Sequence, residues 1–164
     1  MAAIDELIRV EEVGAAEFYV GDLFRRRFAG DPPDYPRHFV ALYKAARNNY
    51  VAVGYIHYTT FEDVALVGGM VEDERALQRM EIAHRTLVAG GGGLAAKLFR
   101  DTMPRFTAFP ALWALVAEPA QRVAFERAGF APADDTTLMV KWNGEFAAAE
   151  RGERIARVNA LGAF

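Results

Sequence analysis

The sequence predicts an α+β domain in which helices flank a mixed, mostly antiparallel central sheet. Two hydrophobic runs, residues 38–45 and 50–58, are separated by the turn-like tripeptide Arg47-Asn48-Asn49, a pattern typical of a β-hairpin. Helical and extended patterns then alternate along the rest of the chain. Because hairpins and helices occur together, helices are expected to cover a partly open sheet. The 164 residues suit one hydrophobic core.

The individual elements follow from hydrophobic spacing and from glycine and proline. Paired glycines, Gly68 and Gly69, fall in the middle of one expected strand, where they indicate a bulge or a close backbone approach. Proline at position 119 suits the first turn of a helix, and Gly129 suits a left-handed cap at its end. The expected elements are a strand over 8–13, a helix over 15–28 ended by Gly30, the hairpin, a strand over 64–71, a helix over 73–88, a helix from 94, a strand over 111–117, a helix over 119–128, a strand over 136–142 and a helical tail.

Composition excludes several classes of function. The 19 basic and 22 acidic residues give a net charge of -3, which argues against broad electrostatic binding of nucleic acid. The basic run Arg25–Arg27 is interpreted as a solvated helix face. Serine and cysteine are both absent from the sequence, so serine-hydrolase chemistry, disulfides and thiolate nucleophiles are excluded. His38, His57 and His84 have no metal-ligand spacing, and no metal is expected.

The chain carries no pattern of secretion or membrane insertion. Its start has neither a basic region nor an apolar core of signal-peptide length. No stretch approaches the roughly 20 apolar residues that span a bilayer. We therefore expect a cytoplasmic protein that does not bind a membrane.

A run of four glycines, Gly90 to Gly93, directly precedes the helix expected from Leu94. Glycine allows the backbone to approach a ligand closely, so that several amides can point at one anion. The start of the helix adds the positive end of its dipole. The run is therefore a candidate phosphate or pyrophosphate loop, although a merely flexible connection has the same composition.

Two segments together resemble the GNAT superfamily of acyl-CoA-dependent N-acetyltransferases. Residues 90–98, Gly-Gly-Gly-Gly-Leu-Ala-Ala-Lys-Leu, resemble the loop that binds the acyl-CoA pyrophosphate in that family. Residues 118–130, ending Phe125-Glu-Arg-Ala-Gly-Phe130, are similar to its Asn-x-x-Ala-x-x-x-Tyr-x-x-x-Gly-Phe signature. The resemblance covers roughly residues 8–143. It implies an acyl-CoA-binding domain over 1–143, with a helical tail over 144–164 packed on or near it.

The resemblance also implies an activity and a set of site residues. The chain would be a transferase that moves an acetyl group from acetyl-CoA to an amine of unknown identity by direct attack, with a homodimer as the expected assembly. Glu72 would be the catalytic base; the alternative for this region is that Asp73 caps the following helix. Phe125 stands where the family often has a tyrosine that protonates the leaving thiolate. The implied cofactor-binding residues are Met70, Val71, Gly90, Gly91, Gly92, Gly93, Leu94, Ala95 and Phe125.

Two other functions remain open at this stage. A degenerate family member could bind acyl-CoA as a sensor or partner domain without turnover, because Gly90 and Phe125 replace residues that the family uses in binding and catalysis. A structural or interaction domain could have a glycine loop that binds nothing.

Overall fold

The structure, a computed structural model, describes residues 2–34, 37–46, 49–134 and 136–162. The strands of this part are β1 (Ile8–Val13), β2 (Arg37–Ala46), β3 (Asn49–Phe61), β4 (Val64–Glu72), β5 (Ala111–Leu115), β6 (Ala131–Pro132) and β7 (Leu138–Trp142). They hydrogen-bond in the order β1-β2-β3-β4-β5-β7-β6. β4 and β5 pair in parallel, whereas β1–β2, β5–β7 and β6–β7 pair antiparallel. The predicted mixed α+β class is confirmed.

Helices precede, separate and follow these strands along the chain. They are α1 (Ala2–Leu7), α2 (Ala16–Phe28), α3 (Glu74–Gln78), α4 (Ile82–Gly90), α5 (Gly93–Thr102), α6 (Pro119–Arg127) and α7 (Ala148–Ala160), with a short 3-10 helix over Met103–Phe106. None of the helices in the described ranges combines the length and apolar character needed to cross a membrane.

The chain forms two compact units, and β3 and β4 contribute residues to both. The first unit comprises Met1–His57 and Gly69–Thr102, and the second comprises Tyr58–Gly68 and Met103–Phe164. The predicted division at residue 143 into a domain and a tail stays a prediction.

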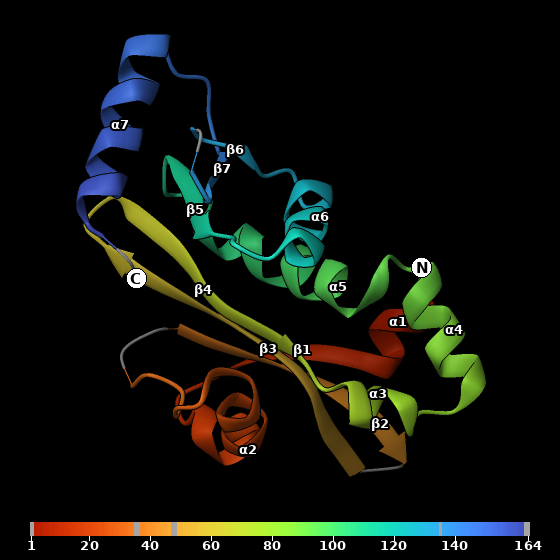
Figure 1. Cartoon of the computed structure of the whole chain (residues 1–164). Coiled ribbons are helices and arrows are strands. Elements are labelled where there is room, and N and C mark those ends of the chain that lie inside the picture. Colours follow the sequence, from red (N-terminus) through yellow and green to blue (C-terminus); the bar gives the residue numbers. More distant parts are fainter. Residues whose placement is uncertain (1, 35–36, 47–48, 135, 163–164) are drawn as a thin grey trace. The chain divides into compact units, whose positions relative to one another are not determined.

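In the first unit, α2 lies on one side of the strands and α5 on the other (Figure 1). Side chains alternate along β3, so that Tyr55 joins the cluster beneath α2 while the neighbouring Gly54 faces α5. The core beneath α2 is made of Ala16, Val20, Leu23, Phe24, Val40, Leu42, Tyr55 and Val71.

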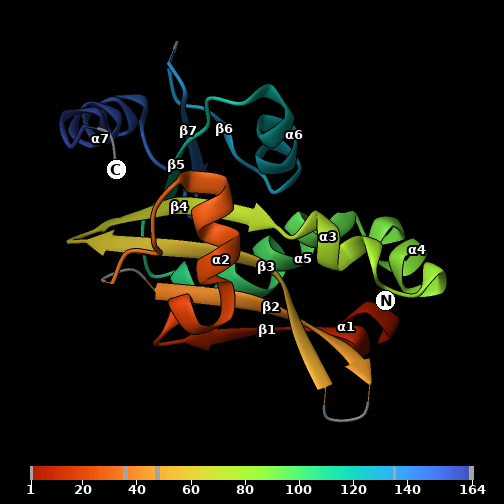
Figure 2. The ribbon, with the colours of Figure 1, turned by 60° about the horizontal axis from the view of Figure 1, so that its bottom comes forward.

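At one end of the first unit, α1, α4 and α5 lie close together (Figure 2). Lys97 of α5 is buried here, and its ammonium group lies 2.7 Å from a carboxylate oxygen of Asp5. Asp101 also pairs with Lys97, and Arg100 pairs with Asp5 at 2.7 Å. A buried lysine is tolerated when it is paired and hydrogen-bonded, so this cluster ties α1 to α5.

The second unit is built around β5, which is apolar and largely buried, as predicted. Trp113 of β5 is 2% exposed and packs edge to face on Trp142, with ring centroids 5.4 Å apart, so both tryptophans belong to the packing of this unit. α7 adds Val158 to the same core. Arg154 and Arg157 of α7 reach Asp63 at 2.8 and 2.6 Å, so the tail helix is held within this unit.

The single helix predicted over residues 73–88 is wrong, because two short helices form there. α3 ends at Gln78 and α4 begins at Ile82. No single apolar stripe runs along the segment: Met80 is 4% exposed and lies in the connection, whereas Leu87 of α4 is 43% exposed. Local spacing alone did not reveal this break.

Two helix ends also differ from the prediction. The left-handed residue that ends α2 is Ala29, with φ of 55°, rather than Gly30. α1 was not predicted, since it spans only six residues. The predicted hairpin turn falls at Arg47 and Asn48, which lie outside the described residues, and Asn49 already belongs to β3.

Candidate functional site

The glycine run connects two helices, as predicted. Gly90 is the last residue of α4 and Gly93 is the first of α5. The amide of Gly91 donates to the Leu87 carbonyl at 3.0 Å, and that of Gly92 donates to the Ala89 carbonyl at 3.1 Å. These two amides therefore close α4 and point away from any ligand at the start of α5.

The turn into α5 depends on backbone conformations that favour glycine. Gly92 and Gly93 have φ values of 91° and 88°, in the left-handed region. Amides in the first turn of a helix have no acceptor within the helix, which applies to Gly93 and Leu94 at the start of α5. This terminus is consequently a group of donors that an anion can satisfy.

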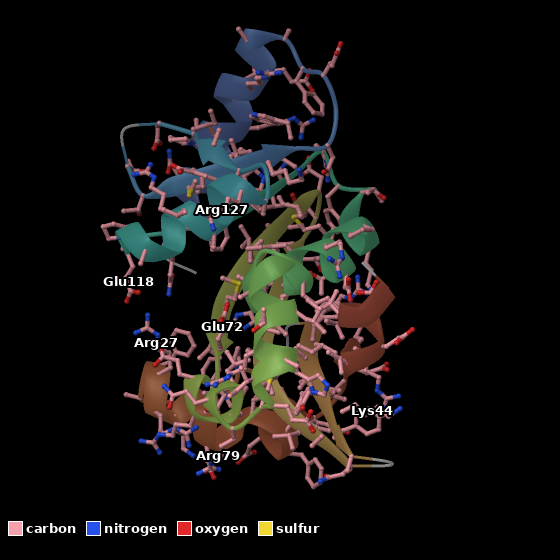
Figure 3. All side chains as sticks on the ribbon, turned by 90° about the vertical axis from the view of Figure 1, so that its right-hand side faces the viewer. Arg27, Lys44, Glu72, Arg79, Glu118 and Arg127 are labelled. Atoms are coloured by element: carbon pink, nitrogen blue, oxygen red, sulfur yellow. The ribbon has the colours of Figure 1, made fainter. Side chains whose placement is uncertain are left out.

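An anion from the chain itself already lies at this terminus. The amide of Ala95, the third residue of α5, donates a hydrogen bond of 2.9 Å to Oε1 of Glu72. Glu72 is the last residue of β4 and is half-buried. Its side chain is labelled in Figure 3. Burial raises the pKa of the Glu72 carboxyl, while the bond from Ala95 opposes that rise. The predicted base is thus held at the predicted pyrophosphate loop.

The next residue, Asp73, serves a second helix start in the same way. Its carboxylate accepts hydrogen bonds from the amides of Arg75 and Ala76 at 3.0 and 3.1 Å. Arg26 adds an ion pair at 3.3 Å. Asp73 is therefore the cap of α3, which confirms the alternative interpretation considered for this position.

α5 approaches the sheet closely at a glycine that sequence reasoning missed. A Cβ at Gly54 would lie 2.6 Å from Cδ2 of Leu94 and 3.3 Å from the carbonyl oxygen of Val71. Leu94 is 1% exposed, so its side chain has little room to move. The signal in the sequence was an isolated glycine inside an otherwise apolar strand, which marks a close approach.

The glycine pair of β4 lies against a histidine. The Gly69 amide donates to Nε2 of His57 at 3.1 Å. A Cβ at Gly69 would lie 3.2 Å from the His57 ring and 3.2 Å from the Phe28 ring. The close backbone approach predicted for this pair is confirmed, and the partner is a side chain. Met70 and Val71 follow directly, with the Val71 side chain in the core beneath α2.

His57 is buried in a small polar and aromatic cluster. Its ring centroid lies 5.6 Å from that of Tyr55 and 6.3 Å from that of His38. His38 Nδ1 and the Tyr55 hydroxyl are 2.6 Å apart. Burial, with a smaller contribution from His38, lowers the pKa of His57 to about 4. Its Nδ1 is buried without a hydrogen-bond partner among the described residues, so only one of the two ring nitrogens is satisfied.

The second segment of the family resemblance, residues 118–130, folds in the second unit. α6 has Pro119 in its first turn, and Gly129 after its end has φ of 93°, both as predicted. Phe125 is 3% exposed and packs edge to face on Phe130 at 5.1 Å. Its ring is thus a core group of this unit.

No cluster of three or more histidine, aspartate or glutamate side chains that could hold a metal occurs in the described ranges. His84 instead pairs with the Tyr43 hydroxyl through Nδ1 at 2.7 Å.

Comparisons with known proteins gave structural similarity alone. No protein-family profile matches the chain, and no curated protein matches it. Similar solved structures include a GNAT-family acetyltransferase from Staphylococcus aureus Mu50, 13% identical, covering 84% of this chain and 99% of that chain at a TM-score of 0.49. The catalytic domain of Tetrahymena GCN5 histone acetyltransferase in complex with coenzyme A is 13% identical, covering 87% and 96% at 0.48. A chain of the KacTA–DNA complex is 11% identical, covering 92% and 99% at 0.46.

Two of these three similar proteins are acetyltransferases, the class that the motifs of this chain resemble. At such identities and TM-scores, the similarity assigns neither a cofactor nor an acceptor to this protein.

Proposed function

We propose that the protein is an acyl-CoA-dependent N-acyltransferase with acetyl-CoA as donor and an amine as acceptor. The pyrophosphate of the donor would bind at the N-terminus of α5, at the amides of Gly93, Leu94 and Ala95. Gly90, Gly91 and Gly92 would shape the approach to this terminus rather than donate to the phosphates, because the Gly91 and Gly92 amides close α4.

One observation carries this proposal: the first turn of α5 already binds a carboxylate. The Ala95 amide donates to Glu72 at 2.9 Å. A helix start that satisfies an oxyanion from its own chain has the geometry and the dipole to bind a phosphate oxygen. Because Glu72 is held only half-buried at the end of a strand, an incoming pyrophosphate can displace its carboxylate toward solvent.

This displacement gives Glu72 its role in the proposed reaction. The amine attacks the thioester carbonyl directly and forms the C–N bond; the C–S bond then breaks, and CoA leaves as a thiolate that takes a proton from water. The rate depends on holding both reactants in line. Once released from Ala95, the Glu72 carboxylate is the acidic group at the end of β4 and would take the proton of the amine through intervening water, because the pantetheine arm separates the pyrophosphate from the thioester. The backbone amides of Met70 and Val71 would donate hydrogen bonds to the developing oxyanion.

The direct test measures release of free CoA from acetyl-CoA with a panel of small amines and N-terminal peptide amines. The proposal predicts amine-dependent thiol release that saturates with acetyl-CoA. Thermal stabilisation by CoA, with no thiol release for any amine, would support binding without catalysis instead, because a ligand specific for the folded state raises stability.

A sensor or partner domain is the second candidate, and one observation favours it. Phe125 is 3% exposed and packed on Phe130, so this position supplies a ring but no proton for a leaving thiolate. The cytoplasmic location, the homodimer and the absence of nucleic-acid binding stay predictions. A light-scattering mass near 18.1 kDa at micromolar concentration would rule out the dimer.

A further inference from the structure

We infer that His57 is a positioning residue of the acyl site: its Nε2 accepts the Gly69 amide proton and thereby sets the backbone of β4 where the thioester carbonyl would be bound. This inference rests on the proposed function. It adds a residue that lies on β3 and that no sequence motif indicated.

The hydrogen bond fixes the tautomer of the imidazole. An amide N–H can only donate, so Nε2 of His57 must carry the lone pair at the 3.1 Å contact with Gly69. In a neutral imidazole one nitrogen donates and the other accepts, so the proton of His57 lies on Nδ1. The imidazole is thus an acceptor dedicated to one strand amide.

Aromatic packing holds this acceptor in place. The His57 ring lies 6.3 Å from the Phe24 ring and 5.6 Å from the Tyr55 ring, measured between centroids. Phe28, whose ring is 4.5 Å from that of Phe24, closes over Gly69 from α2. A Cβ at Gly69 would lie 3.2 Å from both the His57 and the Phe28 rings, so any other residue here would require these rings to shift by a few tenths of an ångström.

Stability alone does not account for a histidine at this position. The residue is 8% exposed, and its Nδ1–H is buried without an acceptor among the residues that the structure describes. An unpaired buried donor costs folding free energy that an apolar side chain of similar size would avoid. A local choice that weakens the fold is expected where it serves a site.

The hydrogen bond between Gly69 and His57 would affect the peptide groups one and two residues after Gly69. Because the Gly69 amide donates to His57 Nε2, the imidazole fixes the direction of the peptide group from which the next residues continue. Met70 and Val71 follow Gly69 directly, and their amides are the donors proposed for the oxyanion. His57 would therefore act on the reaction through the orientation of these two peptide groups, without touching the substrate.

The test compares His57→Leu with His57→Gln, whose side-chain oxygen can still accept the Gly69 proton. His57→Leu should lower kcat by about 10- to 100-fold through misplaced donors, with CoA affinity unchanged. His57→Gln should restore most of the lost kcat. His84→Gln, on α4 and bonded to Tyr43, is the matched control and should leave kcat unchanged. Circular dichroism and thermal melting establish that each variant is folded.

A second readout needs no catalysis. Nitrogen-proton NMR of the wild type should show His57 protonated at Nδ1, with a coupling through the hydrogen bond to the Gly69 nitrogen. An Nε2-protonated His57, or a wild-type kcat in His57→Leu, in a protein that turns over acetyl-CoA would overturn this inference alone. A wild type that neither binds CoA nor releases thiol would overturn the proposed function, and the positioning role with it.

Discussion

The carboxylate of Glu72 and the backbone amide of Ala95 are joined by a 2.9 Å hydrogen bond that links the end of β4 to the first turn of α5. The same carboxylate therefore fills the place where a pyrophosphate oxygen is proposed to bind. The chain competes with its own ligand at this point, and several measurable consequences follow from that competition.

Removing the charge of Glu72 should tighten CoA binding. In Glu72→Gln, the amide oxygen can still accept the Ala95 proton, but it no longer repels the pyrophosphate. A charge at a partly buried helix terminus is worth up to about 2 kcal/mol, and about 1.4 kcal/mol corresponds to a tenfold change in affinity. We expect CoA to bind roughly tenfold more tightly by calorimetry, while kcat falls because the proposed base is lost.

Glu74→Gln is the matched control, because it removes the same charge two residues away in the first turn of α3. Its CoA affinity should change much less than that of Glu72→Gln. Equal gains in both variants would show a general charge effect, and weaker CoA binding in Glu72→Gln would show that Glu72 supports the ligand rather than competes with it.

Substitution of Gly54 should displace α5 from the sheet. A Cβ there would lie 2.6 Å from Cδ2 of the buried Leu94, and overpacking of this kind costs about 1–3 kcal/mol. Gly54→Ala should lower the free energy of unfolding by that amount in urea denaturation and weaken CoA binding. Gly14→Ala, where a Cβ meets no atom within 4 Å, is the control. Adding Leu94→Ala to Gly54→Ala removes the side chain that the new Cβ would strike. If the double variant regains no stability relative to Gly54→Ala, this clash does not cause the loss of stability.

Stability should increase with pH in the acid range because of His57. Its pKa falls from 6.5 to about 4 on folding, mainly through burial, so the native state binds fewer protons than the unfolded state between these values. A shift of this size corresponds to about 3 kcal/mol, which is lost as the pH falls through this range. His38, whose pKa burial also lowers, contributes in the same direction.

The measurement is the free energy of unfolding in urea at about pH 4.5 and about pH 7.5, on either side of the ordinary histidine pKa. In His57→Gln the difference should shrink, with the remainder due to His38 and other groups. An equally steep dependence in this variant would mean that His57 is not the titrating group.

Phe125→Tyr should leave CoA binding intact and either raise the turnover number or leave it unchanged. General acid catalysis typically contributes about 100- to 10,000-fold, but a thiolate is a good leaving group, since a thiol ionises near pH 8.5 in the cysteine reference. The added hydroxyl enters a site that is 3% exposed, so a loss of about 1–3 kcal/mol of stability is expected where it finds no partner. Activity that disappears with affinity and stability intact would show that the family resemblance of α6 is wrongly aligned.

The order of the elements could be predicted from the sequence because most of them carry their own local signal. The apolar β5, the proline that opens α6 and the left-handed Gly129 that follows its end each lie where expected. The break between α3 and α4 was not predicted: the buried Met80 lies in the connection and not on the face of one continuous helix.

The candidate site was only partly predictable for the same reason. Glu72 and the glycine run were selected individually, but the bond between Glu72 and Ala95 joins residues 23 positions apart. His57 and Gly69 lie on neighbouring strands, and their contact depends on the pairing of β3 with β4. Spacing identifies residue types suited to a task, whereas tertiary packing decides which of them meet.

Calorimetric titration of CoA into the wild type, Gly93→Ala and Gly93→Asp tests the central claim most directly. Gly93 has φ of 88° and no atom within 4 Å of a Cβ position, so both variants impose the same backbone strain while only aspartate adds a negative charge at the start of α5. Binding at this terminus predicts measurable affinity in the wild type, a modest loss in Gly93→Ala and a far larger loss in Gly93→Asp, with all three proteins folded. Equal affinity in Gly93→Ala and Gly93→Asp, or no binding to the wild type, would contradict the assignment of this helix start as the acyl-CoA site.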